Sequence, residues 1–369
     1  RPRRPPMSAP DRADGAPAAA EPDGAGTEGA PAAGAPTHAS PALRVAVVGA
    51  GAVGSVLGGR LAGAGVEVTF LARGATLAAL RTHGLALETP DGVVRLPPGH
   101  AVGSPTELGA VDAVLLAVKA AQVREVAATL APLLAAHTVV VPLQNGVEAS
   151  AELAAALPPP QVAEGLCRML AEQVAPGRVR YGWPTPSVTI GARATGGDDG
   201  AALGAAPRAT LARLAAALRA GGVVVEEPAD VHAALWAKLL FVEPLGVVGA
   251  AARSPFGVLL GTPETRALLQ RCLEEIVAVA RSCGAALDDA ALADAWRRYE
   301  ALPAQGTTSL QRDLVAGRPS ELDAQTGAVV RLGRAHAVPT PAHETLYAVL
   351  HAQEGRAAGV APAAPAERG

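Results

Sequence analysis

The chain has 369 residues, half of them hydrophobic, which is enough to bury the cores of two domains. Its formal net charge of −3 argues against a surface that binds nucleic acid or membranes. Three scattered cysteines exclude a disulfide framework or a zinc site. The sequence has no charge-free apolar run of about 18 residues, so a membrane span is not predicted. We therefore expect a cytoplasmic protein without nucleic-acid or membrane partners.

Both ends of the chain differ in composition from the rest. Residues 1–42 and 355–369 consist largely of Ala, Pro and Gly with scattered charges, and such segments cannot bury enough apolar surface to fold. No apolar stretch follows the opening RPRRPP, so a secretory signal is not predicted. We expect two disordered tails around a folded region.

The most informative stretch is VAVVGAGAVG at residues 45–54. Its β-branched run predicts a strand over 44–48, and the Ala-rich sequence after it predicts a helix over 52–64. The glycines between them have the G-x-G-x-x-G spacing of a dinucleotide-binding loop, in which they permit a tight turn, a close approach to the pyrophosphate and close helix packing. The helix N-terminus then faces the phosphates. The predicted cofactor contacts are Gly49, Ala50, Gly51, Ala52, Val53 and Gly54.

The end of the next predicted strand, at 66–71, bears on the choice of cofactor. NAD-binding sites usually place Asp or Glu near this point, but here Arg73 follows the strand, and no carboxylate lies between Val68 and Leu80. A guanidinium suits a 2′-phosphate through its charge and paired hydrogen bonds. We therefore predict NADP(H) rather than NAD(H); the alternative is an ordinary surface arginine.

The remainder of the first half alternates between strands and helices, which is typical of a Rossmann-type doubly wound parallel sheet. We expect a type I′ hairpin turn at Asp91-Gly92, an antiparallel pair at the sheet edge over 178–191, and one helix and strand within 207–226. The region 43–229 is thus predicted to be a NADP-binding domain. Its other expected elements are strands near 113–118 and 138–143, helices over 75–83, 121–135 and 148–156, and a hairpin over 85–96.

Residues 230–354 are predicted to form an all-helical substrate and catalytic domain. The clearest helix covers 263–283, with Thr262 as its cap and Gly284 at its end. A crevice between the two halves is the expected place for an active site. The Ala- and Leu-rich helical half is also compatible with a homodimer. We expect His336, His343 and His351 to be solvated helix residues.

Three stretches carry candidate chemistry. Lys119 ends one apolar strand and Asn145 follows the next, at the carboxyl edge where doubly wound sheets bind ligands. An ordinary polar turn is the alternative for Gln-Asn-Gly at 144–146. Lys238 is the only charge between Asp230 and Glu243, so it either snorkels to solvent or is functional. Burial lowers a lysine pKa and makes the ammonium a better proton donor.

Taken together, these motifs resemble the 2-dehydropantoate 2-reductases, also called ketopantoate reductases. The resemblance covers residues 44–352 and includes the glycine loop, Lys119, the Gln-Asn-Gly turn and Trp236-x-Lys238. It extends to the segments 307–313 and 317–323, in which Ser309 and Glu321 are 12 residues apart.

The resemblance implies a role for each of these residues. The family reduces the C2 carbonyl of ketopantoate with NADPH, giving (R)-pantoate on the route to coenzyme A, and needs no metal. Lys238 would be the general acid, Glu321 would hold the lysine and the substrate hydroxyl, and Ser309 would bind the substrate carboxylate. Lys119 and Asn145 would line the nicotinamide and substrate pocket, and Arg73 would bind the 2′-phosphate. Without the resemblance, Ser309 would be a helix cap and Glu321 an acid in the first turn of a helix.

One departure from the family pattern bears on the substrate. Many members carry Asn four residues after the catalytic lysine, where this chain has Val242, and Glu243-Pro244-Leu245-Gly246 replaces an Asn-rich sequence. Another branched 2-oxo acid is therefore an alternative substrate. A non-catalytic NADP(H)-binding regulatory protein is a further alternative, although such a protein would not need Lys238, Ser309 and Glu321 together.

Overall fold

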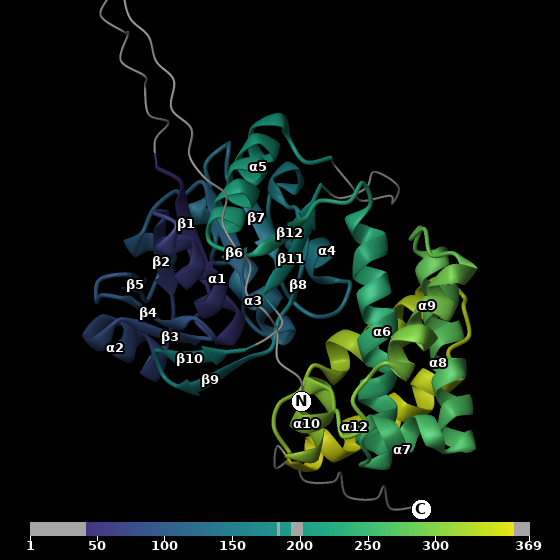
Figure 1. Ribbon diagram of the computed structural model, residues 1–369. Coiled ribbons are helices and arrows are strands. Elements are labelled where there is room, and N and C mark those ends of the chain that lie inside the picture. The colour runs from purple at the N-terminus through teal and green to yellow at the C-terminus, as the bar shows by residue number, and fades with distance from the viewer. Residues whose placement is uncertain (1–41, 183–184, 193–201, 358–369) are drawn as a thin grey trace, which may run out of the picture. The chain divides into compact units, whose positions relative to one another are not determined.

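The computed structural model describes residues 42–182, 185–192 and 202–357 (Figure 1). Within them, the chain from Ala42 onward belongs to one compact unit. The predicted tails fall almost wholly outside the described residues. The exceptions are Ala42 and residues 355–357, which continue the last helix, α12 (Pro341–Ala357), past its predicted end.

The central sheet has five parallel strands in the order β5-β2-β1-β6-β7. Alternate residues of its strands enter two separate hydrophobic cores, so both faces are buried. Helices α1 and α5 supply the core on one face, and α3 and α4 supply the other. The predicted doubly wound fold is confirmed. The bounds are β1 (Arg44–Val48), β2 (Glu67–Leu71), β5 (Ala101–Val102), β6 (Ala113–Leu116), β7 (Val139–Pro142), α1 (Ala52–Gly63), α2 (Gly74–His83), α3 (Val123–Ala127), α4 (Ala149–Ala154) and α5 (Ala205–Ala220).

Two smaller sheets accompany the central one. Their orders are β4-β3-β10-β9 and β12-β11-β8, and α1 packs against the first of them through Val56. The predicted hairpin is present as β3 and β4, but Thr89 pairs with Gly92, so Pro90 and Asp91 form the turn. Proline cannot adopt the positive φ of a type I′ turn, and that prediction is wrong. The bounds are β3 (Leu85–Thr89), β4 (Gly92–Leu96), β8 (Glu164–Arg168), β9 (Ala171–Ala175), β10 (Arg178–Tyr181), β11 (Ser187–Gly191) and β12 (Val224–Glu226).

Two further predictions for this half are wrong. The segment 178–191 forms β10 and β11, but these strands lie in different sheets and do not pair with each other. Alternating apolar and polar residues predict a strand, but they do not predict the sheet edge with which the strand pairs. The helix expected over 121–135 is broken into α3 and short 3₁₀ turns at 120–122 and 131–133. Pro132, which lacks an N–H and disfavours helical backbone before it, accounts for the second of these breaks.

The second half is helical, as predicted, and is built around the long helix α6. Thr262 precedes α8 as expected, but its hydroxyl donates to the Val258 carbonyl (2.8 Å) instead of capping the helix. Gly284 follows α8 with a φ of +80°, as its predicted role requires. The helices are α6 (Val231–Ala252), α7 (Phe256–Gly261), α8 (Pro263–Ser282), α9 (Asp289–Glu300), α10 (Ser309–Val315), α11 (Ala328–Ala335) and α12.

Helix α6 contains a proline, and the structure compensates for it. Pro244 cannot donate to the Leu240 carbonyl one turn earlier, and the buried Tyr299 hydroxyl of α9 donates to that oxygen instead (3.1 Å). Among the described residues α6 is the one helix whose length and composition would allow it to cross a membrane, but 67% of its apolar window is buried inside the protein. It is the central core helix of this half.

One histidine differs from its prediction. His336 and His351 are exposed, whereas His343, at the start of α12, is fully buried between Glu243 of α6 and Glu275 of α8. The prediction for His343 was wrong because its carboxylate partners are 68 and 100 residues away in the chain.

Candidate functional site

The site is built at the carboxyl ends of β6 and β7. Lys119 follows β6 and Asn145 follows β7, two strands that pair directly. The buried Gln144 amide donates to the carbonyls of Leu116 (2.9 Å) and Val118 (3.0 Å), which fastens the end of β7 to the end of β6. The two strand ends therefore present their next residues from a fixed base.

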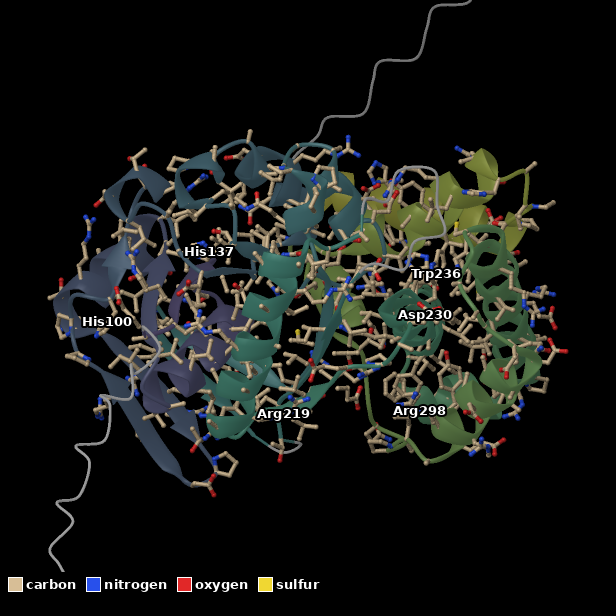
Figure 2. The ribbon with its side chains drawn as sticks, turned by 90° about the horizontal axis from the view of Figure 1, so that it is seen from above. His100, His137, Arg219, Asp230, Trp236 and Arg298 are labelled. Carbon is tan, nitrogen blue, oxygen red and sulfur yellow. The ribbon has the colours of Figure 1, made fainter. Side chains whose placement is uncertain are left out.

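Lys238 reaches this edge from α6. The helix begins after Asp230, whose carboxylate accepts from the Ala233 N–H (2.9 Å). Figure 2 labels Asp230, at the start of the helix, and Trp236 within it. The Lys238 ammonium donates to Asn145 Oδ1 (2.6 Å) and to the Cys167 carbonyl of β8 (2.7 Å). It therefore does not snorkel to solvent. Burial lowers the pKa of Lys238 below its ordinary value, and the negative charge of Glu321 opposes this effect.

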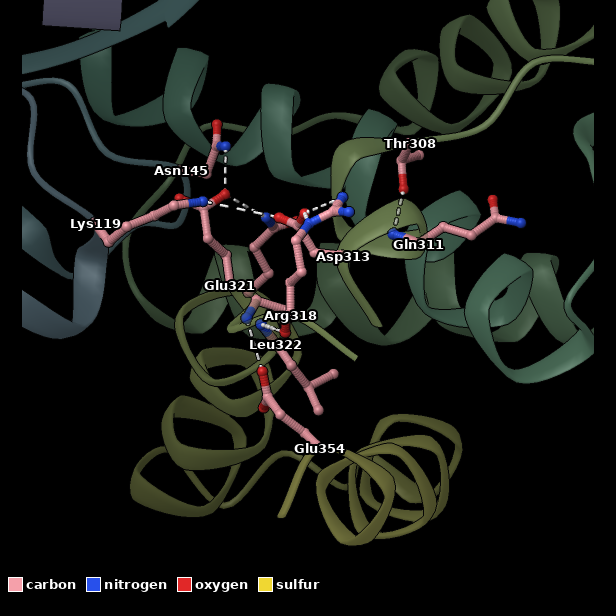
Figure 3. Close-up of polar contacts among 11 residues, drawn as sticks. Lys119, Asn145, Thr308, Gln311, Asp313, Arg318, Glu321, Leu322 and Glu354 are labelled. Carbon is pink, nitrogen blue, oxygen red and sulfur yellow. Dashed lines mark hydrogen bonds and ion pairs between the residues drawn. The ribbon is translucent and has the colours of Figure 1, made fainter. Parts of the chain in front are cut away.

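Glu321 completes a hydrogen-bonded set with Lys238 and Asn145. The Asn145 amide, whose oxygen accepts from Lys238, donates through Nδ2 to Glu321 Oε2 (2.6 Å; Figure 3). Glu321 immediately precedes α11 and its leading π turn (Asp323–Gly327), an irregularity common at functional sites. Gly146 has a φ of +101°, and a Cβ there would overlap the Ala324 carbonyl. The glycine therefore lets this turn approach Asn145 closely.

Lys119 and Ser309 lie outside this set. The Lys119 ammonium lies 3.8 Å from Asp313 Oδ2, and Arg318 also pairs with Asp313 (2.8 Å; Figure 3). Ser309 is exposed in the first turn of α10, one turn before Asp313, and its hydroxyl has no hydrogen bond within the described ranges. Thr308, rather than Ser309, caps α10 by accepting from the Gln311 N–H (3.1 Å).

The glycine loop borders a cavity of about 590 Å³. Gly49 turns with a φ of +101° against the Ala117 backbone, and a side chain at Gly54 would overlap the Gly49 carbonyl. A Cβ at Gly51 would meet open space, so the backbone there can approach a ligand. Gly51 is also the N-cap of α1 and has no side chain to accept from the N–H groups of Val53 and Gly54. These features fit a dinucleotide pyrophosphate at the helix N-terminus.

Arg73 lies on the wall of this cavity, together with Thr76 of α2. Its side chain is 66% exposed, and its guanidinium lies 3.0 Å from Glu125 Oε1 of α3. This pair is exposed enough to be weak, so the guanidinium is available to an anion.

A second cavity, of about 400 Å³, borders the set and is lined by Asn145, Glu321, Arg124 and Arg331. The described residues contain no cluster of His, Cys, Asp or Glu that could hold a metal.

Sequence reasoning missed several partners in this site. Gln144 was noted only as part of a turn, and Asp313 only as part of a resembling segment. Gln325, buried in the π turn, donates weakly to Glu321 (3.4 Å). The Cys167 carbonyl carries no sequence signal, because any residue type supplies one.

Comparisons with known proteins agree with this architecture. The model of the ketopantoate reductase PanE/ApbA family matches residues 45–194, and the model of its C-terminal domain matches residues 230–354. The 2-dehydropantoate 2-reductase of Halobacterium salinarum is 31% identical over 305 residues, which cover 82% of this chain and 96% of that protein. The Caulobacter vibrioides 2-dehydropantoate 2-reductase is 33% identical over 314 residues, covering 84% and 98%.

Solved structures give the same result. A PanE/ApbA family ketopantoate reductase from Ralstonia eutropha JMP134 has a TM-score of 0.74 and 33% identity, covering 86% of this chain and 100% of that one. A D-mandelate dehydrogenase solved with NADH and anilino(oxo)acetate has the same TM-score at 22% identity, which shows a shared fold alone. Both halves of the chain thus match one group of oxidoreductases: the chain belongs to the ketopantoate reductase family.

Proposed function

We propose that this protein is a cytoplasmic enzyme that reduces ketopantoate to (R)-pantoate with NADPH, in the biosynthesis of pantothenate and coenzyme A. The observation that carries the proposal is the partly buried Lys238 ammonium, held by Asn145 and the Cys167 carbonyl beside Glu321. We assign cofactor binding to residues 43–229 and substrate binding and catalysis to residues 230–354, a division supported by the two family matches.

The cavity at the glycine loop is the proposed cofactor site. Residues 49–54 would hold the pyrophosphate, and Arg73 with Thr76 would hold the 2′-phosphate. The D-mandelate dehydrogenase of the same fold binds NADH, so the preference for NADPH rests on Arg73 of this chain rather than on the fold. NADPH, when bound, supplies a hydride for the C2 carbonyl of the substrate.

Lys238 is the proposed general acid. As negative charge develops on the substrate oxygen, the ammonium stabilises it and then donates its proton. Its lowered pKa makes the proton easier to transfer near neutral pH. Glu321 would hold the substrate hydroxyl, Ser309 would bind the carboxylate, and Lys119 and Asn145 would line the pocket shared by nicotinamide and substrate.

The basic residues of the chain support this assignment. Of its 31 lysine and arginine residues only two are lysine, and these are Lys119 and Lys238. Arginine serves every other cationic position, yet it stays protonated in proteins and cannot deliver a proton. Lysine at position 238, in a chain that uses arginine almost everywhere else, therefore fits a role in proton transfer.

A second candidate substrate follows from Val242. This residue lies one turn after Lys238 on α6 and is half-buried, so it offers an apolar surface close to the acid. We therefore keep other branched 2-oxo acids, without the hydroxyl of ketopantoate, as the alternative substrates.

The test is the loss of NADPH absorbance with ketopantoate and a panel of other 2-oxo acids. We expect turnover of ketopantoate, and a Lys238→Ala variant that binds NADPH normally but turns over at least about 100-fold more slowly. Equal loss of binding and turnover would contradict the acid assignment. Turnover of a different acid alone would select the alternative substrate, and NADPH binding without any turnover would favour a regulatory protein.

The cofactor preference has its own test. We expect Arg73→Ala to raise the KM for NADPH about ten- to a hundredfold and to leave the KM for NADH nearly unchanged, because only NADPH carries the 2′-phosphate. Arg95→Ala, at an exposed arginine of β4 outside the cavity lining, is the matched control. An equal effect of Arg73→Ala on both cofactors would contradict the assignment.

A further inference from the structure

A buried cluster of polar and charged side chains lies within the helical half, apart from the proposed substrate contacts. Glu243 of α6 and His343 of α12 are both fully buried. The Thr326 hydroxyl donates to Glu243 Oε1 (2.6 Å), and His343 Nε2 lies 3.1 Å from Glu243 Oε2. On its other side, His343 Nδ1 contacts Glu275 Oε2 of α8 (2.6 Å). Every polar side-chain atom of Glu243 and His343 therefore has a partner.

The cluster joins the same two elements that carry the proposed catalytic pair. Glu243 lies five residues after Lys238 on α6, and Thr326 lies five residues after Glu321 on the segment that enters the π turn. The two elements therefore meet twice. They meet at the site through Asn145, and again in the core through Thr326 and Glu243.

Stability alone does not require such a cluster, because replacing a whole buried ion pair by apolar residues is often neutral or stabilising. A role in fixing register does account for it. An inserted residue in a helical turn rotates the preceding residues by about 100° about the axis, so the π turn decides where Glu321 faces. The Thr326–Glu243 hydrogen bond holds that turn against α6.

We propose that Thr326 and Glu243 are positioning residues that hold Glu321 in register with Lys238 and Asn145, and that His343 and Glu275 brace Glu243. The inference rests on the proposed function, in which Lys238 and Glu321 act on the substrate.

The variant that tests it is Thr326→Val, which keeps the shape of the side chain and removes the hydroxyl. Thr326→Ser restores the donor. Thr340→Val is the matched control, since the Thr340 hydroxyl is buried in the same half and has no hydrogen-bond partner among the described residues.

The two lysines give a readout that does not depend on turnover. Protein labelled with ¹³C-lysine yields two lysine signals, and the one lost in Lys238→Arg identifies Lys238. The charged or ionisable groups that act on it are Cys167, Glu321 and Arg168. Displacing Glu321 moves one of the negative charges that raise the Lys238 pKa away from the ammonium, so in Thr326→Val the titration of Lys238 moves to lower pH.

For Thr326→Val we expect kcat to fall about ten- to a hundredfold with the KM for NADPH unchanged. We expect Thr326→Ser to recover both kcat and the Lys238 titration, and Thr340→Val to leave both at wild-type values. An unchanged Lys238 titration in folded Thr326→Val, or the same change in Thr340→Val, would overturn the inference. If the wild type reduces none of the acids, the proposed function fails, and the titration still decides the positioning role.

Discussion

Asn145 has a fixed orientation because its amide serves two different neighbours. Its oxygen accepts from the Lys238 ammonium, and its nitrogen donates to the Glu321 carboxylate. A carboxylate could accept from Lys238 but could not donate to Glu321, so asparagine fits between a cation and an anion where aspartate does not.

This arrangement predicts opposite pH shifts for two single substitutions. Asn145→Asp adds a negative charge beside Lys238 and so raises the pKa of Lys238. The alkaline limb of the plot of kcat against pH then moves to higher pH. Glu321→Gln removes a charge that raises the same pKa, and the limb moves to lower pH. The measurement is kcat from pH 6 to 10 in steps of about half a unit, wide enough to resolve shifts of about one pKa unit. Limbs that move in the same direction would show that another group controls them.

Tyr299 gives a prediction about stability. Tyr299→Phe leaves the Leu240 carbonyl unpaired next to Pro244, and we expect the free energy of unfolding to fall by about 1–3 kcal/mol in denaturant titrations. Tyr181→Phe is the control, since the Tyr181 hydroxyl makes no hydrogen bond in the described segments. Equal losses in the two variants would mean that the Tyr299 hydroxyl has no special role.

At the scale of elements, the contact between the Gln-Asn-Gly turn and the π turn depends on one glycine. Gly146→Ala introduces both backbone strain and an overlap with Ala324, which pushes the π turn and Glu321 away from Asn145. We expect kcat to fall at least about tenfold, with an added loss of about 1–3 kcal/mol in stability.

Gly99 separates the two effects. It has a φ of +106°, close to that of Gly146, but a Cβ there meets open space. Gly99→Ala therefore carries the strain without the overlap, and we expect its kcat to match the wild type. If both variants keep full kcat, the close approach at Gly146 is not needed for activity.

The elements also show what the sequence could and could not predict. The β1–loop–α1 unit was predictable, because the glycine spacing and the flanking periodicity are local. The partners of β10 and β11 were not, since pairing depends on which sheet edges are open. In the site, Lys238, Asn145 and Glu321 could be named from their motifs. The Cys167 carbonyl, the π turn and the Thr326–Glu243 bond arise only from packing between distant segments.

At the scale of the whole molecule, His343 links stability to pH. Burial alone would lower the pKa of His343, but Glu243 and Glu275 outweigh it and raise the value to about 9. Because the folded value exceeds the ordinary 6.5, this contribution to stability is complete below pH 6.5 and is lost as the pH rises to about 9. Its size is at most about 3 kcal/mol.

We therefore expect the Tm to decline between pH 6.5 and 9, and thermal unfolding followed by circular dichroism measures it. His343→Gln flattens this dependence, although it also lowers the overall Tm because Glu243 is left without its charged partner. His336→Asn, at an exposed histidine, keeps the wild-type slope. A slope that persists in His343→Gln would assign the effect to other groups.

The amide of Gln144 has one more consequence. It donates hydrogen bonds to the carbonyls of Leu116 and Val118. Val118 lines the cavity of the glycine loop, and Asn145, which follows Gln144, lines the second cavity. One buried side chain therefore lies behind the walls of both cavities, and a substitution at Gln144 would alter the two walls together.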